Sequence, residues 1–181
     1  MVTPSRPGAI LRRAPSLAEP HLLGSPSEGG GIRHARRVWL AGAVNDETQA
    51  TITRLLTTTH RWAVVGLSAN DRRAAYGVAR FLQQSLAIEI VPVHPRADTV
   101  HGAVGYATLA EVPGPVDVVD VFVRAELAGA VVDEAIAVGA RAVWLQLGVV
   151  DTAAAARARA AGLDVVMDAC PAIEAPRLGL V

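Results

Sequence analysis

From residue 62 onward, short apolar runs alternate with longer segments in which apolar residues recur at helical spacing. The runs consist mostly of Val, Ile and Leu rather than of alternating apolar and polar residues, which is typical of strands buried on both faces. They predict strands at 62–66, 88–93, 116–122, 142–145 and 163–167. The amphipathic segments predict helices at 47–58, 74–85, 126–138 and 152–161, the first of them capped by Asp46.

Strands that alternate with helices predict a parallel sheet with helices on both faces. With right-handed crossovers, the expected fold class is α/β, a Rossmann-like doubly wound parallel sheet of about five strands. Gly139 and Gly162 each follow a predicted helix, where a left-handed cap residue is needed. A chain of 181 residues suffices for one domain with a full core, so we expect a single ordered domain over residues 46–181.

Residues 1–45 differ from the rest of the chain in composition and charge. They are rich in Pro, Gly, Ser and Arg, and their six arginines against two glutamates give a net charge of +4. The remainder carries 11 arginines and 15 acidic residues, a net charge of −4. A segment like 1–45 buries too little apolar surface to offset its chain entropy, so a disordered N-terminal extension is predicted. A targeting segment and a misassigned start site are the alternatives.

Several classes of protein are disfavoured by composition. The acidic body argues against nucleic-acid binding, which needs a basic face. No apolar run approaches the roughly 18 to 20 residues that span a bilayer, and no signal-peptide core is present near the start. Cys170 is the only cysteine, which excludes an internal disulfide and fits a reducing compartment. A cytoplasmic location is therefore expected.

The loop after the first predicted strand has the features of a phosphate site. Gly66 permits a tight turn, Ser68 offers a hydroxyl donor, and the following helix presents free amide groups and a positive dipole end. The second and third glycines of the dinucleotide fingerprint are missing. Asn70 and Asp71 are interpreted as helix-capping residues, because a carboxylate beside a phosphate would repel it.

The end of the second predicted strand bears on the identity of the nucleotide. An NAD site usually places an acidic residue there to hold the ribose hydroxyls, whereas this strand is followed by His94 and Arg96. Arginine pairs with a ribose phosphate, as in NADP or coenzyme A, through its bidentate fork. A solvated surface arginine is the alternative interpretation. NAD is disfavoured.

Several segments together resemble the coenzyme-A-binding domain family, whose members are stand-alone relatives of the N-terminal domain of succinyl-CoA synthetase alpha subunits. The segments read AVVGLS, VPVHP, VDVVDVFVR, AIAVGARAVWLQLGV and AGLDVVMDACPAIE, and the resemblance covers about residues 48–178. It implies that coenzyme A or an acyl-CoA binds in a cleft at the carboxyl ends of the strands. The chain departs from the family at His94, Ala169 and Ala175, where Asn, Arg and His are usual. The last two departures argue against an anion or acid-base role for the final loop.

The resemblance also assigns expected contacts. It places the glycine loop against the phosphates, Arg96 near the phosphorylated ribose, Val123 and Arg124 beside the adenine, and Gln146 beside the pantetheine arm. The expected coenzyme-binding residues are Gly66, Leu67, Ser68, Arg73, His94, Arg96, Val123, Arg124 and Gln146.

Catalysis by this chain is not expected. No Ser-His-Asp order, paired carboxylates or metal-ligand spacing stands out, and the phosphorylated histidine of the synthetases lies on a second domain. Cys170, Trp62 and Trp144 are interpreted as packing residues, and His101 as exposed. The sequence therefore favours a binding protein for coenzyme A, without nucleic acid or membrane and with a protein partner or homo-oligomer as an option. The alternatives are an NADP-type oxidoreductase domain and a ligand-free scaffold that acts through a protein partner.

Overall fold

The computed structural model describes residues 46–181, and the predicted extension at 1–45 lies outside them. Its strands form one parallel sheet in the order β2-β1-β3-β4-β5. The strands are β1 (Arg61–Val65), β2 (Glu89–Val93), β3 (Val118–Val121), β4 (Ala142–Leu145) and β5 (Asp164–Met167). The prediction of a Rossmann-like doubly wound sheet of five strands is confirmed.

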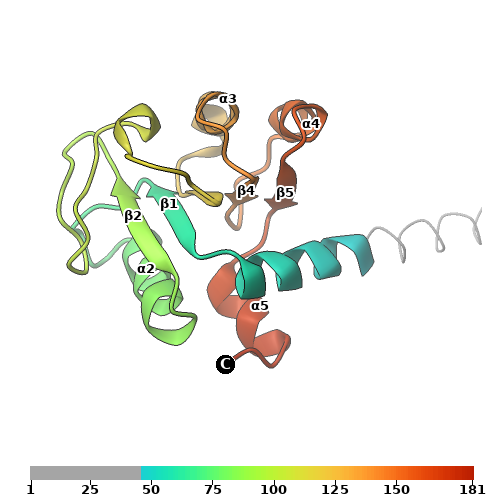
Figure 1. Cartoon of the computed structure of the whole chain (residues 1–181), viewed down its shortest axis with the longest axis horizontal. Coiled ribbons are helices and arrows are strands. Elements are labelled where there is room, and N and C mark those ends of the chain that lie inside the picture. The colour runs from blue at the N-terminus through green and yellow to red at the C-terminus, as the bar shows by residue number, and fades with distance from the viewer. Residues whose placement is uncertain (1–45) are drawn as a thin grey trace, which may run out of the picture.

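Helices cover both faces of the sheet (Figure 1). One face packs against the helix at 46–58, α2 (Ala74–Ser85) and α5 (Pro171–Arg177). The other face packs against the 3-10 turn η1 (Leu109–Glu111), α3 (Ala125–Ala137) and α4 (Thr152–Ala160). Alternate strand residues enter the two cores, since Val118 lies in the first and Val119 in the second. Burial on both faces explains why the strands read as unbroken apolar runs.

The helix bounds differ from the predictions at a few positions. The first helix already includes Asp46, so it extends one residue further than predicted. Helix α5 was not predicted from the sequence. It begins at Pro171, a residue that suits the first helical position because its missing N–H would have no partner there.

Gly66 brings the ends of three strands together. Its φ of +96° lies in the region that disfavours side chains, and its amide donates to the Val93 carbonyl at 2.8 Å. A Cβ atom at this position would lie 2.6 Å from the carbonyl oxygen of Phe122. The absence of a side chain therefore allows the segment after β1 to approach both β2 and β3.

The crossover from β2 to β3 is unusual because it lacks a full helix. The crossovers that leave β1, β3 and β4 carry helices of 12, 13 and 9 residues. The segment at 94–117 carries η1 alone, which has three residues. Tyr106 bonds to the end of β2, since its amide donates to Pro92 and its carbonyl accepts from His94, each at 2.9 Å. Leu109, Val112 and Val116 of this connection pack in the core and cover the sheet in place of a helix.

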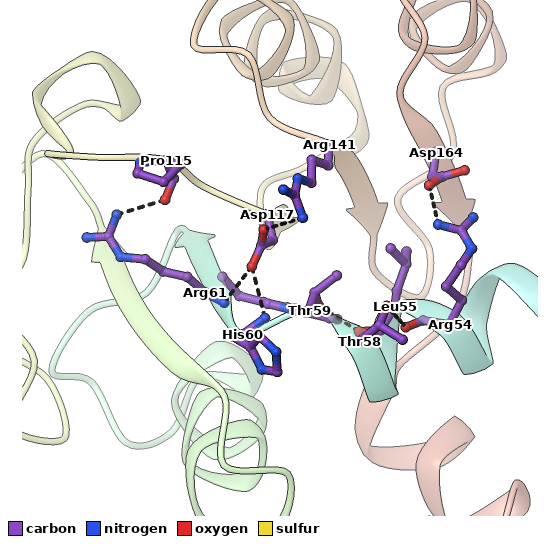
Figure 2. A network of polar contacts seen from close by, with 11 residues as sticks. Arg54, Leu55, Thr58, Thr59, His60, Arg61, Pro115, Asp117, Arg141 and Asp164 are labelled. Atoms are coloured by element: carbon purple, nitrogen blue, oxygen red, sulfur yellow. Dashed lines mark hydrogen bonds and ion pairs between the residues drawn. The ribbon is translucent and has the colours of Figure 1, made fainter.

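A polar network ties the amino ends of the strands together (Figure 2). The Asp117 carboxylate accepts from the backbone amides of His60 and Arg61, at 2.9 and 3.1 Å. It also lies 3.3 Å from the Arg141 guanidinium. The Arg61 guanidinium donates to the Pro115 carbonyl at 3.0 Å. These contacts join the segments before β1, β3 and β4 at the end of the sheet opposite the strands' carboxyl ends.

We expect Asp117→Ala to lower the free energy of unfolding by roughly 3 kcal/mol, because it leaves two backbone amides, of which that of Arg61 is partly buried, without their charged acceptor. Urea unfolding would measure the loss. Arg141→Ala is the matched control: its side chain is 75% exposed, so its ion pair should contribute less than about 1 kcal/mol. Equal losses in the two variants would contradict the view that the amide contacts dominate.

Candidate functional site

A cleft of about 850 Å³ opens at the carboxyl ends of β1, β2 and β3. β1 lies between β2 and β3, both of which follow it in the chain, so the strand order reverses here. Ligands of doubly wound sheets bind at such a reversal. One wall is the face of α3 that carries its residues from Leu127 to Glu134, and the facing wall is the segment at 107–108 that the short crossover places there. The lining is mainly apolar, with Val65, Val93, Pro95, Ala107, Phe122, Val123, Leu127, Ala130 and Val131.

Part of the expected contact set lines this cleft. These residues are Gly66, Arg73, His94, Val123 and Arg124. They come from the ends of β1, β2 and β3 and from the starts of α2 and α3, so residues distant in sequence meet at one place. A second hollow of about 200 Å³ adjoins the cleft at Gly66, Arg73 and Phe122, beside the first turn of α2.

The cleft is cationic where the two helices begin. Arg73 and Arg124 occupy the N-cap positions of α2 and α3, and neither side chain caps its helix. Neither guanidinium has a hydrogen bond or ion pair within residues 46–181. The free amides and positive dipole ends of both helices add to this field. The arrangement fits a group with several negative charges.

His94 adds a further polar group at the same end. Its Nδ1 atom accepts from the Arg96 backbone amide at 3.2 Å. In the neutral imidazole this contact assigns the proton to Nε2, which makes Nε2 a donor. This backbone contact therefore defines the tautomer of the neutral ring.

Asn70 and Asp71 do not cap α2, contrary to the interpretation from the sequence. The N-cap position is Arg73, and the Asn70 side chain instead accepts from the Arg72 amide at 3.1 Å, within the preceding turn. The start of α2 is consequently left without a side-chain cap, as an anion site requires.

Leu67 and Ser68 do not line the cleft. Leu67 has no exposed surface and packs in the core under α2, and Ser68 is also buried, at 3% exposure. The chain turns inward after Gly66, which places the Leu67 side chain in the core on the α2 face of the sheet. Their predicted contact with a ligand stays a prediction.

Arg96 and Gln146 are held by carboxylates elsewhere. The Arg96 guanidinium bonds Asp98 at 2.9 and 3.1 Å, and this contact lowers the pKa of the Asp98 carboxyl group. Asp98 also accepts from the Ala69 amide at 3.4 Å, so it joins the loops after β1 and β2. Gln146 is buried and donates to Asp120 at 2.7 Å. Neither side chain lines the cleft, and their assigned roles stay predictions.

Asp120 is a buried carboxyl group that the sequence reasoning missed. It lies in β3 with no exposed surface, and its second oxygen has no hydrogen-bond partner within the described part of the chain. Burial raises its pKa to about 8, while the Gln146 hydrogen bond opposes that shift. The sequence feature that could have indicated this buried carboxyl group is an acidic residue inside a run of valines.

Other residues weighed from the sequence have structural roles. Burial raises the pKa of the Cys170 thiol, and Trp62 and Trp144 are fully buried, which confirms their interpretation as packing residues. The expectation that His101 is exposed is wrong: its Nε2 atom lies 2.8 Å from the Tyr76 carbonyl, and its ring lies 4.2 Å from that of Tyr76. Residues 46–181 contain no group of three potential metal ligands. None of the described helices is long and apolar enough to cross a membrane.

The fold and the place of the cleft put this chain in the Rossmann-like class of α/β proteins. A family model described as a CoA binding domain matches residues 60–176. The chain belongs to that CoA-binding domain family, as the sequence resemblance implied. It is 34% identical over 127 residues to the uncharacterized protein YneT of Bacillus subtilis (strain 168), covering 70% of this chain and 93% of that protein.

Solved structures show the same fold. A hypothetical protein from Pyrococcus horikoshii OT3 is 32% identical, with a TM-score of 0.68, and the match covers 72% of this chain and 91% of that one. A dinucleotide-forming acetyl-coenzyme A synthetase from Ca. Korarchaeum cryptofilum is 21% identical, with a TM-score of 0.56. That match covers 64% of this chain and 27% of the synthetase, and at this identity it supports the fold alone.

Proposed function

We propose that this protein binds coenzyme A or an acyl-CoA in the cleft between β1, β3 and α3, and that the chain itself does not catalyse a reaction. One observation carries the proposal. Arg73 and Arg124, which have no partner within residues 46–181, stand at two helix starts and border a groove with mainly apolar walls. Coenzyme A is complementary to both features, because it carries several phosphates and a flat, largely apolar base.

The phosphates would lie at the cationic end, which gives Arg124 a phosphate contact where the family resemblance implied a place beside the adenine. Arg73 and Arg124 can each form charge-assisted hydrogen bonds with phosphate oxygens, and His94 can donate from Nε2. Gly66 lines the cleft, but Phe122 occupies the space that its missing side chain leaves, and its own amide already donates to Val93. The first amides of α2 and α3 are therefore the better backbone donors.

The base would lie in the apolar part of the groove. Val123 and Leu127 form one wall, with Ala107 on the facing segment, and these can enclose a flat ring. Gln146 and Arg96, which bond carboxylates in this structure, would need to exchange those partners to contact the ligand.

The absence of catalysis is inferred from the chemistry of the lining. Its titratable groups are His94 and Glu134 besides the two arginines, and no thiol lines it. Neither His94 nor Glu134 bonds a side chain that could serve as a nucleophile within the part of the chain that the structure describes. An NADP-type domain remains the competing function, and the binding experiment includes that ligand.

We expect coenzyme A to bind the full-length protein in calorimetric titration, and Arg73→Ala and Arg124→Ala each to weaken binding roughly tenfold or more. The reason is the loss of a charge-assisted contact to phosphate. Arg159→Ala is the control, because this exposed arginine lies in the last turn of α4, outside the cleft. Heat with NADP but none with coenzyme A would favour the oxidoreductase alternative. No heat with either ligand would contradict the proposal.

A further inference from the structure

The cleft has one acidic residue in its lining, Glu134, and that residue breaks an otherwise apolar stripe. Leu127, Ala130, Val131 and Glu134 follow the i, i+3, i+4, i+7 spacing that places side chains on one face of a helix. The first three members form the apolar wall of the groove. The fourth position carries a carboxylate where a further apolar residue would have completed the same wall.

Glu134 is an exposed side chain of α3. Its side chain has no hydrogen bond and no ion pair within residues 46–181. The neighbouring Asp133, by contrast, bonds Arg157 of α4 at 2.9 and 3.1 Å on another side of α3. The carboxylate of Glu134 is thus left available to a ligand in the groove.

The positions of Arg124 and Glu134 determine which way round a ligand would lie in the cleft. Ten residues separate it from Arg124, and a helix rises 1.5 Å per residue, so the two side chains lie about 15 Å apart along α3. A carboxylate beside phosphates would repel them, so the ligand's negative groups belong at the Arg124 end. The part of the ligand that reaches Glu134 must instead carry a hydrogen-bond donor.

We propose that Glu134 selects a base with an exocyclic amino group. This inference rests on the proposed function, in which the apolar groove encloses the base of coenzyme A. Ionised Glu134 only accepts hydrogen bonds, and the amino group of adenine donates two. Thr108 on the facing wall carries a hydroxyl that both donates and accepts, so it cannot make the same distinction. Glu134 is therefore a specificity residue at the base end of the cleft.

The test compares coenzyme A with an analogue in which hydrogen replaces the amino group of the base. We expect the wild-type protein to bind coenzyme A roughly five- to twentyfold more tightly in calorimetric titration, because the analogue leaves Glu134 facing a ring nitrogen that only accepts. Glu134→Ala should reduce this ratio to about one, since alanine can neither accept from the amino group nor donate to the ring nitrogen. Asp133→Asn, the matched control one residue away, should keep the wild-type ratio.

The outcomes separate this inference from the function on which it rests. If coenzyme A binds but the wild-type protein does not distinguish the analogue, or Glu134→Ala keeps the full ratio, the selectivity proposal is wrong and the coenzyme site stands. If coenzyme A does not bind the wild-type protein, both proposals fail. Circular dichroism of Glu134→Ala checks folding, which should be unchanged because the side chain is exposed.

Discussion

Asp120→Asn is expected to stabilise the protein by roughly 5 kcal/mol at pH 8 and to change its stability by less than about 1 kcal/mol at pH 4. The Asp120 carboxyl group is fully buried, and burial raises its pKa from 3.8 to about 8. Between these pH values the unfolded chain releases the proton while the folded chain keeps it. The free energy of unfolding of the wild-type protein is therefore highest, as far as Asp120 is concerned, below about pH 4. It falls as the pH rises, and the contribution of the protonated group is lost above about pH 8.

Urea unfolding of both proteins at pH 4, 6 and 8 would measure this difference. Asparagine keeps the oxygen that accepts from Gln146, so the change removes the ionisation without removing the hydrogen bond. Asp71→Asn, in the exposed turn before α2, is the control and should leave the pH dependence unaltered. Parallel stability curves for the wild type and Asp120→Asn would show that Asp120 does not hold its proton in the folded state.

Gly66→Ala is expected to lower the free energy of unfolding by about 3 kcal/mol or more and to weaken ligand binding with it. An alanine would be strained at φ +96°, and its Cβ atom would lie 2.6 Å from the Phe122 carbonyl oxygen. That oxygen belongs to the backbone, so relief requires β1 and β3 to separate where the cleft has its floor. Thermal unfolding and coenzyme titration would report the two effects.

Gly77→Ala provides the matched control. Gly77 lies in α2, and a Cβ atom there would have no neighbour within 4 Å. The same substitution should therefore stabilise the protein by about 0.5 to 1 kcal/mol, because alanine has the higher helix propensity. A loss at Gly77 similar to that at Gly66 would show that the strain argument is wrong.

The sequence predicted the position of the cleft because apolar runs reveal where each strand ends. Ligands bind at the carboxyl ends of parallel strands, and the strands were readable from their apolar runs. This is why Gly66, His94, Val123 and Arg124 were predicted correctly to meet at one edge of the sheet. Helix α5 escaped prediction because its seven residues are too few to show a clear helical period.

The remaining contacts depend on side-chain partners that spacing does not reveal. Arg96 bonds Asp98, two residues further along, instead of facing the cleft. Gln146 bonds Asp120 on a neighbouring strand, a pairing that follows from the register of β3 and β4. Glu134 lies inside a predicted helix, and the sequence does not reveal that one face of this helix lines a cleft opposite residues 107 and 108.

The crossover at 94–117 has two duties that different residues carry. Tyr106 and Asp117 bond neighbouring strands, and Leu109, Val112 and Val116 pack in the core, so these positions support the sheet. Residues 107 and 108 instead line one wall of the cleft. Ligand preference on this scaffold can thus diversify by substitution of two loop residues, while the positions that hold the sheet stay the same.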